Sequence, residues 1–308
     1  MKRKVVKQGT STLMISLPSD WASRLKIRKG DELEVDAIES TLLVSTKKEH
    51  FDKETELNID GLSPMIQVSG GAIFRAGYDK LKLTFSESNR IADVNAAVRD
   101  EFSGFEIIEQ GRTYCVIKKI EEGMDGSFEL VLRRAFLLLL SMAEEGLEAL
   151  KKGDCGDFDR LMQLERANNR LTNYCMRFLA KKGYEKPGKV QFIHYIVEQL
   201  EKLADEYWFL FATLKRKYSK GAKPSKDVVG YYSTVNESLR MFYELFYKFD
   251  KKKLVKIGES YFSLMGYYDQ VSKTDRLMDG KDAAVIHRLA NIEEFTFSMV
   301  GPYLSLVL

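Results

Sequence analysis

Apolar and polar positions alternate over short stretches in the first 48 residues, a period that is typical of β-strands. Gly9 begins a turn between the first two apolar runs, and Pro18 ends the second run because proline has no N–H for a strand ladder. A short helix capped by Ser19 or Asp20 follows. The predicted elements are strands at 4–7 and 12–17, a helix with Trp21, Ala22 and Leu25 on its apolar face, and strands at 33–37 and 42–44.

Residues 1–48 form a unit that is too small to bury a stable core by itself. Small domains commonly gain the missing burial by oligomerisation. We therefore expect two copies of this segment to dimerise through shared strands.

A second segment, 55–119, mixes strand and helix patterns after a polar linker at 50–56. The order strand–helix–strand–helix–strand–strand predicts a small α+β domain with its helices on one face of a sheet. Gly70 and Gly71 fall inside the first helix, where close packing explains them better than a phosphate-binding loop. The predicted elements are a strand at 56–61, a helix starting at Ser63-Pro64 and ending at Gly77, a strand at 81–85, a helix capped by Ser88 or Asn89, and strands at 105–109 and 113–117.

From residue 126 onward the apolar positions recur with the period of amphipathic helices. The stripe on the third helix, from Ile193 to Leu214, is continuous and rich in aromatic side chains, which predicts core rather than a cofactor site. A basic loop at 215–226 divides the helices three and three, which indicates two bundles in tandem. A solvated linker explains this loop better than a phosphate-binding segment. The predicted helices are 126–152, 155–182, 187–219, 224–249, 251–275 and 280–307.

The composition of the 308 residues, 44% hydrophobic and 30% charged, is typical of a folded protein of two or three domains. The longest apolar run, 135–143, is too short to span a bilayer, and the chain opens on a basic strand rather than a signal peptide. We therefore expect a cytoplasmic protein. Three widely spaced cysteines, Cys115, Cys155 and Cys175, predict reduced thiols rather than disulfides or a zinc site.

No catalytic motif is present. The three histidines are isolated from any serine, cysteine or acidic partner motif, and no nucleotide-binding fingerprint occurs. The sequence therefore predicts a protein that is not an enzyme.

The positive charge is concentrated at one end of the chain. Residues 1–48 hold ten Lys/Arg against six Asp/Glu, a net charge of +4, whereas the whole chain carries +3. The remaining 260 residues therefore sum to −1. A basic segment of this kind favours contact with a polyanion.

The spacing of these N-terminal residues resembles the AbrB/MazE (SpoVT-AbrB) swapped-hairpin domain. The resemblance implies an intertwined homodimer that binds duplex DNA with basic residues of its paired hairpins. By position, the resemblance implies contacts from Arg3, Lys4, Lys7 and Ser11, with Arg24, Lys26 and Arg28 nearby. The alternative is that these are solvated charges on a module that only dimerises. The matching residues are Lys7, Gly9, Ser11, Leu13, Ile15, Leu17, Pro18, Trp21, Leu25, Ile27, Gly30, Asp31, Leu33 and Val35.

The two helical halves are related to each other. Residues 200–205 read LEKLAD and residues 286–291 read IHRLAN, each within the third helix of its half. This duplication resembles the PhoU family, whose tandem three-helix bundles carry an E-x-x-x-D motif. PhoU-like helices combined with an AbrB-type domain and an α+β insert resemble an archaeal arrangement.

The PhoU resemblance implies a metal site, divalent or of the iron type, on these helices. Glu201 and Asp205 keep the two carboxylates of the motif, four residues apart on one helix face, where both can bind one hard cation. His287 and Asn291 stand at the equivalent positions of the second half and depart from the motif. Glu165 and Asn169 form a similar partial pair. Solvated faces or partners of Lys/Arg are the alternative explanation.

The multidomain organisation predicts domains at 1–48, 55–119 and 125–308, the last with halves at 125–219 and 224–308. The first hypothesis is a DNA-binding regulator of phosphate uptake whose helical domain senses an effector or docks on a transporter ATPase subunit or a signalling protein. The second is an adaptor that binds proteins and metal and only dimerises through its N-terminus. A third, an antitoxin-like repressor, is disfavoured because antitoxin tails are short and often disordered, whereas this C-terminal region forms a core.

Overall fold

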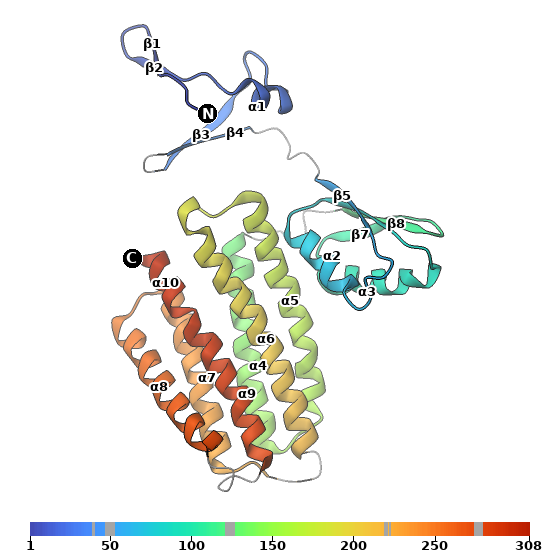
Figure 1. Cartoon of the computed structure of the whole chain (residues 1–308). Coiled ribbons are helices and arrows are strands. Elements are labelled where there is room, and N and C mark those ends of the chain that lie inside the picture. The colour runs from blue at the N-terminus through green and yellow to red at the C-terminus, as the bar shows by residue number, and fades with distance from the viewer. Residues whose placement is uncertain (39–40, 47–52, 121–126, 219–220, 222, 274–279) are drawn as a thin grey trace. The chain divides into compact units, whose positions relative to one another are not determined.

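The structure is a computed structural model that describes residues 1–38, 41–46, 53–120, 127–218, 221, 223–273 and 280–308 (Figure 1). It divides into two compact units, Met1–Phe51 and Asp52–Leu308, which are taken separately below. The start of the predicted linker, 50–52, and residues 219, 220 and 222 of the predicted basic loop lie outside the described residues. The predicted multidomain order of a small β region, an α+β region and a helical region is confirmed.

The N-terminal unit consists of two antiparallel strand pairs and one short helix. Strands β1 (Val6–Gln8) and β2 (Thr12–Met14) pair across the turn at Gly9, whose φ of 70° favours glycine. The predicted strand at 12–17 is shorter here because its ladder ends where Met14 meets Val6. Helix α1 (Ser19–Arg24) follows Pro18, and β3 (Leu33–Ile38) pairs with β4 (Thr41–Thr46).

The first part of the second unit is a four-stranded sheet with two helices. The sheet order is β5-β6-β8-β7, with β5 and β6 parallel and the other neighbours antiparallel. The helices cover one face, where Leu81, Leu83 and Ile117 join Phe74 and Val94 in a core. The elements are β5 (Glu54–Asn58), α2 (Ile66–Arg75), β6 (Lys80–Thr84), a 3₁₀ turn (Ser88–Arg90), α3 (Ile91–Glu101), β7 (Phe105–Gln110) and β8 (Tyr114–Lys119).

Two details of α2 follow from its packing and its start. A side chain on Gly70 would place its Cβ 3.2 Å from the Phe102 ring, so this glycine allows the close approach of α2 to the end of α3. The predicted start at Ser63-Pro64 is wrong. The helix begins at Ile66, and Pro64 lies in the preceding turn.

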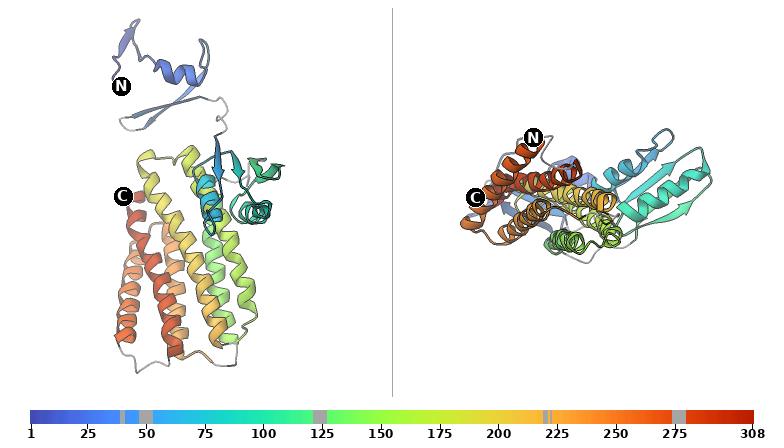
Figure 2. Two further views of the ribbon diagram at one scale, coloured as in Figure 1. Left: turned by 45° about the vertical axis from the view of Figure 1, so that its right-hand side comes forward. Right: turned by 90° about the horizontal axis from the view of Figure 1, so that it is seen from below.

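The second part of this unit is an array of long helices with one continuous core (Figure 1). Helices α4, α5 and α6 contact one another, as do α7, α8 and α9, so each half forms a three-helix set. The sets join through α6 against α9 and α4 against α7, so the two three-helix bundles in tandem share one core. Figure 2 shows α5 and α8 toward opposite sides of this array. The helices are α4 (Phe128–Lys152), α5 (Asp157–Lys182), α6 (Val190–Tyr218), α7 (Lys226–Tyr247), α8 (Lys251–Lys273), α9 (Gly280–Ser298) and α10 (Val300–Val307), with a 3₁₀ turn (Pro187–Lys189) before α6.

The last predicted helix, 280–307, is interrupted at Met299. Pro302 has no N–H to donate to the carbonyl of Ser298, so the α-helical ladder cannot continue through this turn. The sequence interpretation missed this break. No helix in the described part of the chain is both long enough and apolar enough to span a membrane.

A buried ion pair joins the α+β region to the helices. Arg177 of α5 donates from Nη2 to Asp79 Oδ1 at 2.6 Å, and the two side chains are only 8% and 4% exposed. Its Nη1 donates to the carbonyls of Phe74 and Tyr78 at 2.9 and 2.7 Å, and its guanidinium lies over the Phe74 and Phe105 rings. Burial raises the pKa of Asp79, but hydrogen bonds from Lys181 and the backbone N–H of Lys53 outweigh it and lower the pKa overall. The pair is therefore charged and fully bonded at neutral pH.

Arg177→Met should lower the free energy of unfolding by about 3 kcal/mol, because it removes the buried cationic partner of Asp79 and leaves the carbonyls of Phe74 and Tyr78 without their donor. Urea denaturation followed by circular dichroism measures this change. Lys82→Met is the control, since it removes an exposed ion pair with Glu56 worth about 0.5 kcal/mol. Equal losses in the two variants would contradict the central role of Arg177.

Candidate nucleic-acid interface and acidic cluster

The residues predicted to contact DNA are all exposed in the N-terminal unit. Arg3 and Lys4 precede β1, Lys7 lies within it, and Ser11 lies in the turn that follows. The other three are close together around the end of α1: Arg24, Lys26 and Arg28. None of these six cationic side chains forms an ion pair with another residue in the described part of the chain. Their charges are therefore available to a partner.

The same unit exposes its apolar side chains. Among its described residues none is buried, and Leu13 of β2 is 70% exposed. A folded segment with this much exposed apolar surface requires a partner to cover it. The exposed large hydrophobic residues are Val5, Val6, Leu13, Met14, Ile15, Leu17, Val35, Leu42 and Leu43.

Lys26 has an unusual backbone conformation. Helix α1 ends with hydrogen bonds from the N–H of Ile27 to the carbonyl of Ala22 and from the N–H of Lys26 to that of Ser23. This bonding pattern places the residue after the C-cap in the left-handed region, where glycine is usual. Lys26 adopts it with φ of 52°, at a cost of about 1 kcal/mol. The sequence offered no signal for this strain, because lysine is not a typical residue for this position.

A cluster of carboxylates lies in the second unit, at the junction of α3, α5 and α6. Glu201 and Asp205 of α6 interact electrostatically with Glu165 of α5 and with Glu101, the last residue of α3. Glu101 accepts hydrogen bonds from Gln67 at 3.0 Å and Asn173 at 2.7 Å. Sequence reasoning missed Glu101, because only the docking of the α+β region brings α3 to α6.

The cluster raises the pKa values of its members. Burial is the main cause for Glu201, followed by the charge of Asp205, whereas Arg75 acts in the opposite direction. Burial and the charges of Glu165, Glu206 and Glu101 raise the pKa of Asp205 to about 6. Burial also raises the pKa of Glu165, although a hydrogen bond from Asn169 partly offsets it. These groups therefore hold protons more tightly than exposed carboxyls do.

The two aligned motifs do not form one site. His287 Nδ1 lies 2.9 Å from the Tyr268 hydroxyl of α8, whereas Asn291 donates to Glu206 of α6 at 3.0 Å. Arg288 also donates to Glu206, at 3.1 Å. The second half therefore uses these positions for a contact between its own helices α8 and α9 and for contacts with α6 of the first half.

The carboxylate donors of the cluster are of the type that hard cations prefer. However, no three His, Cys, Asp or Glu side chains among the described residues converge with the geometry of a metal centre. The metal site at Glu201 and Asp205 stays a prediction, and no chemistry is derived from it.

Lys26→Gly should stabilise the N-terminal unit by about 1 kcal/mol, because glycine adopts the left-handed conformation without a steric cost. Chemical denaturation of the full chain in a Trp208→Phe background, with Trp21 fluorescence as the probe, measures this change. The control is Lys29→Gly, which removes the same charge at an ordinary φ. A destabilised Lys26→Gly variant would show that the side chain makes contacts that outweigh the backbone strain.

The cluster should make stability fall as pH rises from about 4 to 6. Over this window the native Asp205, with its pKa raised to about 6, keeps protons that an unfolded chain has lost. Asp205→Asn should therefore be more stable than the parent at pH 8, by about 1 kcal/mol, and should show a flatter profile. Urea midpoints between pH 4 and 8 test this, with the exposed Glu148→Gln as the control. If the Asp205→Asn variant keeps the parental pH profile, the carboxylate cluster does not cause the pH dependence of stability.

Comparison with known proteins identifies the N-terminal unit only in its general type. Residues 6–51 match the family model described as antidote-toxin recognition MazE, bacterial antitoxin. None of the curated proteins compared matches the chain. The matched segment spans β1 to β4 and includes Lys7, Arg24, Lys26 and Arg28, whereas Arg3 and Lys4 precede it. The N-terminal unit is therefore similar to domains of the MazE/AbrB type, which typically dimerise and bind DNA.

Proposed function

We propose that this protein is a homodimeric, DNA-binding transcriptional regulator. The N-terminal unit binds duplex DNA, and the unit formed by residues 52–308 responds to an effector or a partner protein. The observation that carries the proposal is the combination, in one small unit, of unpaired cations, an uncovered apolar surface and the match to a MazE/AbrB-type domain.

The electrostatics support DNA rather than a protein partner at the basic residues. The net charge of +4 in residues 1–48 has no counterpart in the rest of the chain. Arg and Lys neutralise backbone phosphates, whereas the covering of an apolar surface requires no net charge. The exposed apolar residues and the exposed cations thus have different roles: dimerisation and DNA contact.

The process that is regulated is proposed from the helical array. Its two related three-helix sets resemble PhoU proteins, which supports a role in phosphate uptake and a partner such as a transporter ATPase subunit or a signalling protein. The mechanism is a linkage, in which binding to residues 52–308 changes the equilibrium between DNA-competent and DNA-incompetent states of the dimer.

The full chain should bind duplex DNA with an affinity that falls as salt rises, and an Arg3→Ala/Lys4→Ala/Lys7→Ala variant should lose most of this binding. Each lost phosphate contact reduces the slope of log K against log salt by about 0.9. Fluorescence anisotropy at several salt concentrations measures both effects. The control, Lys251→Ala/Lys252→Ala/Lys256→Ala, removes the same charge from exposed positions of α8.

Equal losses in the two triple variants would indicate nonspecific attraction to the net charge. If the full chain does not bind DNA, the hypothesis of a DNA-binding regulator is wrong. The hypothesis of an adaptor protein that uses its N-terminus only to dimerise is then favoured.

The full chain should be a dimer that depends on the N-terminal apolar surface. Leu13 and Ile15 alternate on one side of the chain, so Leu13→Glu/Ile15→Glu places two charges in the surface that the partner copy covers. Sedimentation velocity should show a monomer for this variant at concentrations where the parent is a dimer. Val255→Glu/Phe262→Glu alters equally exposed apolar residues of α8 and should leave the dimer intact. The reverse pattern would place the dimer interface on the helical array.

A further inference from the structure

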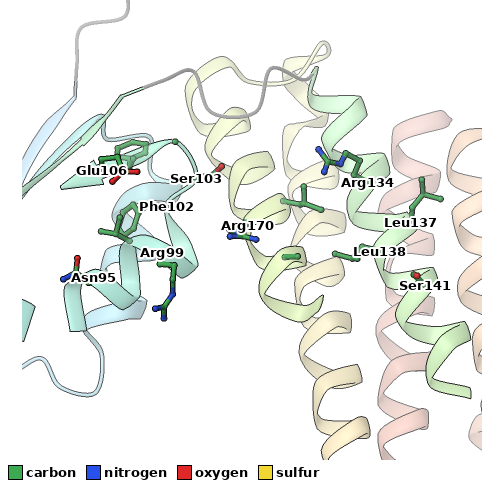
Figure 3. Close-up of a pocket in the computed structure, with 15 residues that line it drawn as sticks. Asn95, Arg99, Phe102, Ser103, Glu106, Arg134, Leu137, Leu138, Ser141 and Arg170 are labelled. Carbon is green, nitrogen blue, oxygen red and sulfur yellow. The ribbon is translucent and has the colours of Figure 1, made fainter. Parts of the chain in front are cut away.

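A cleft of about 880 Å³ lies where the α+β region meets the helices (Figure 3). One wall is formed by α3, the turn after it and β7, and the other by α4 and α5. Clefts of this size at the junction of two substructures are typical places for small-molecule binding. The cleft is separate from the acidic cluster and from the residues assigned to DNA.

Three arginines line this cleft from three different helices. Arg99 lies on α3, Arg134 on α4 and Arg170 on α5, as Figure 3 shows. Arg99 is paired with Asp100, whereas Arg134 and Arg170 form no ion pair or hydrogen bond with any other described residue. Glu106 is the one acidic residue of the lining. Two guanidinium groups are therefore free to bind an anion.

A second hollow extends this basic region. It has a volume of about 410 Å³, shares Arg99 and Arg170 with the first, and adds Arg166, Trp208 and one carboxylate, Asp100. The pKa of Asp100 is lowered, mainly by its hydrogen bond with Arg99, with further contributions from the charges of Arg166 and Arg170. Arg166 and Arg170 are four residues apart and so lie on the same face of α5. The positive potential thus belongs to the whole face.

The lining between the arginines is apolar. Phe102, Leu137 and Leu138 are labelled in Figure 3, and Val98 and Leu171 complete this surface. Leu137 is 47% exposed, which is unusual for a leucine in the middle of a long helix. Covering such a surface with an apolar or aromatic group removes it from water, which is favourable for binding. A simple inorganic anion leaves it uncovered.

We propose that this cleft binds a small molecule that carries a phosphate group on an apolar or aromatic body. Guanidinium groups match phosphate oxygens with two parallel hydrogen bonds, and arginines on both walls can hold a group with several anionic oxygens. The body of the ligand packs on the exposed Leu137 and the half-buried Leu138. Because the cleft lies entirely within residues 52–308, ligand binding there does not depend on the proposed DNA binding.

Calorimetric titration of the full chain tests this site with two matched pairs of probes: adenosine monophosphate against adenosine, and phenyl phosphate against phenol. Inorganic phosphate is the fifth probe. At least one phosphate ester should bind with a Kd below about 1 mM, more tightly than inorganic phosphate and its own neutral partner by about tenfold or more. Arg170→Gln and Arg134→Gln should each weaken that binding by about tenfold.

Arg216→Gln is the matched control, because Arg216 is an exposed arginine of α6 that lines neither hollow. It should change the Kd by less than about twofold. Thermal melting shows whether each variant is folded, which is expected because both Arg134 and Arg170 are exposed. Three results overturn the proposal: no phosphate ester binds, the neutral partner binds equally well, or the two cleft variants bind as the parent does.

Discussion

The architecture of residues 52–308 depends on one buried ion pair, between Arg177 and Asp79. Asp79 stands at the start of β6, and Arg177 reaches it from α5 while also bonding two carbonyls at the end of α2. A buried guanidinium is tolerated only when its donors and its charge are satisfied. Asp79 and the two carbonyls of the α+β region satisfy them here, so the pair anchors that region where it docks on the helices. The acidic cluster and the basic cleft both exist because of this docking.

The junction between the α+β region and the helices has a basic side and an acidic side. On α3, Arg99 lines the basic cleft and Glu101 faces the acidic cluster, although they are two residues apart. On α5, Arg166 and Arg170 face one way, while Glu165 interacts with the carboxylates of α6. Like charges on each side repel one another and weaken the junction. A bound anion relieves the repulsion on the basic side, and protonation relieves it on the acidic side. Such an arrangement suits a region whose stability responds to ligands.

The N-terminal unit is the opposite case, because a single copy has no buried core among its described residues. It has strand pairs, a helix and the left-handed Lys26, but none of its described residues is buried. Small units with uncovered apolar strands commonly depend on a partner for their stability. The six cations assigned to DNA contact, by contrast, are exposed and form no ion pair within the described residues. This difference separates the surface proposed for dimerisation from the surface proposed for DNA.

The sequence by itself determined the order of domains, the approximate limits of most helices and strands, and the concentration of cations near Lys7. These follow from short-range rules, namely the residue period and turn residues such as Gly9. Only the tertiary structure decided that the two helical sets share one core, that Glu101 joins Glu201 and Asp205, and that Arg134 and Arg170 line one wall of a cleft opposite Arg99. Those contacts join residues far apart in the chain. Their geometry depends on how whole faces pack, which residue periods do not encode.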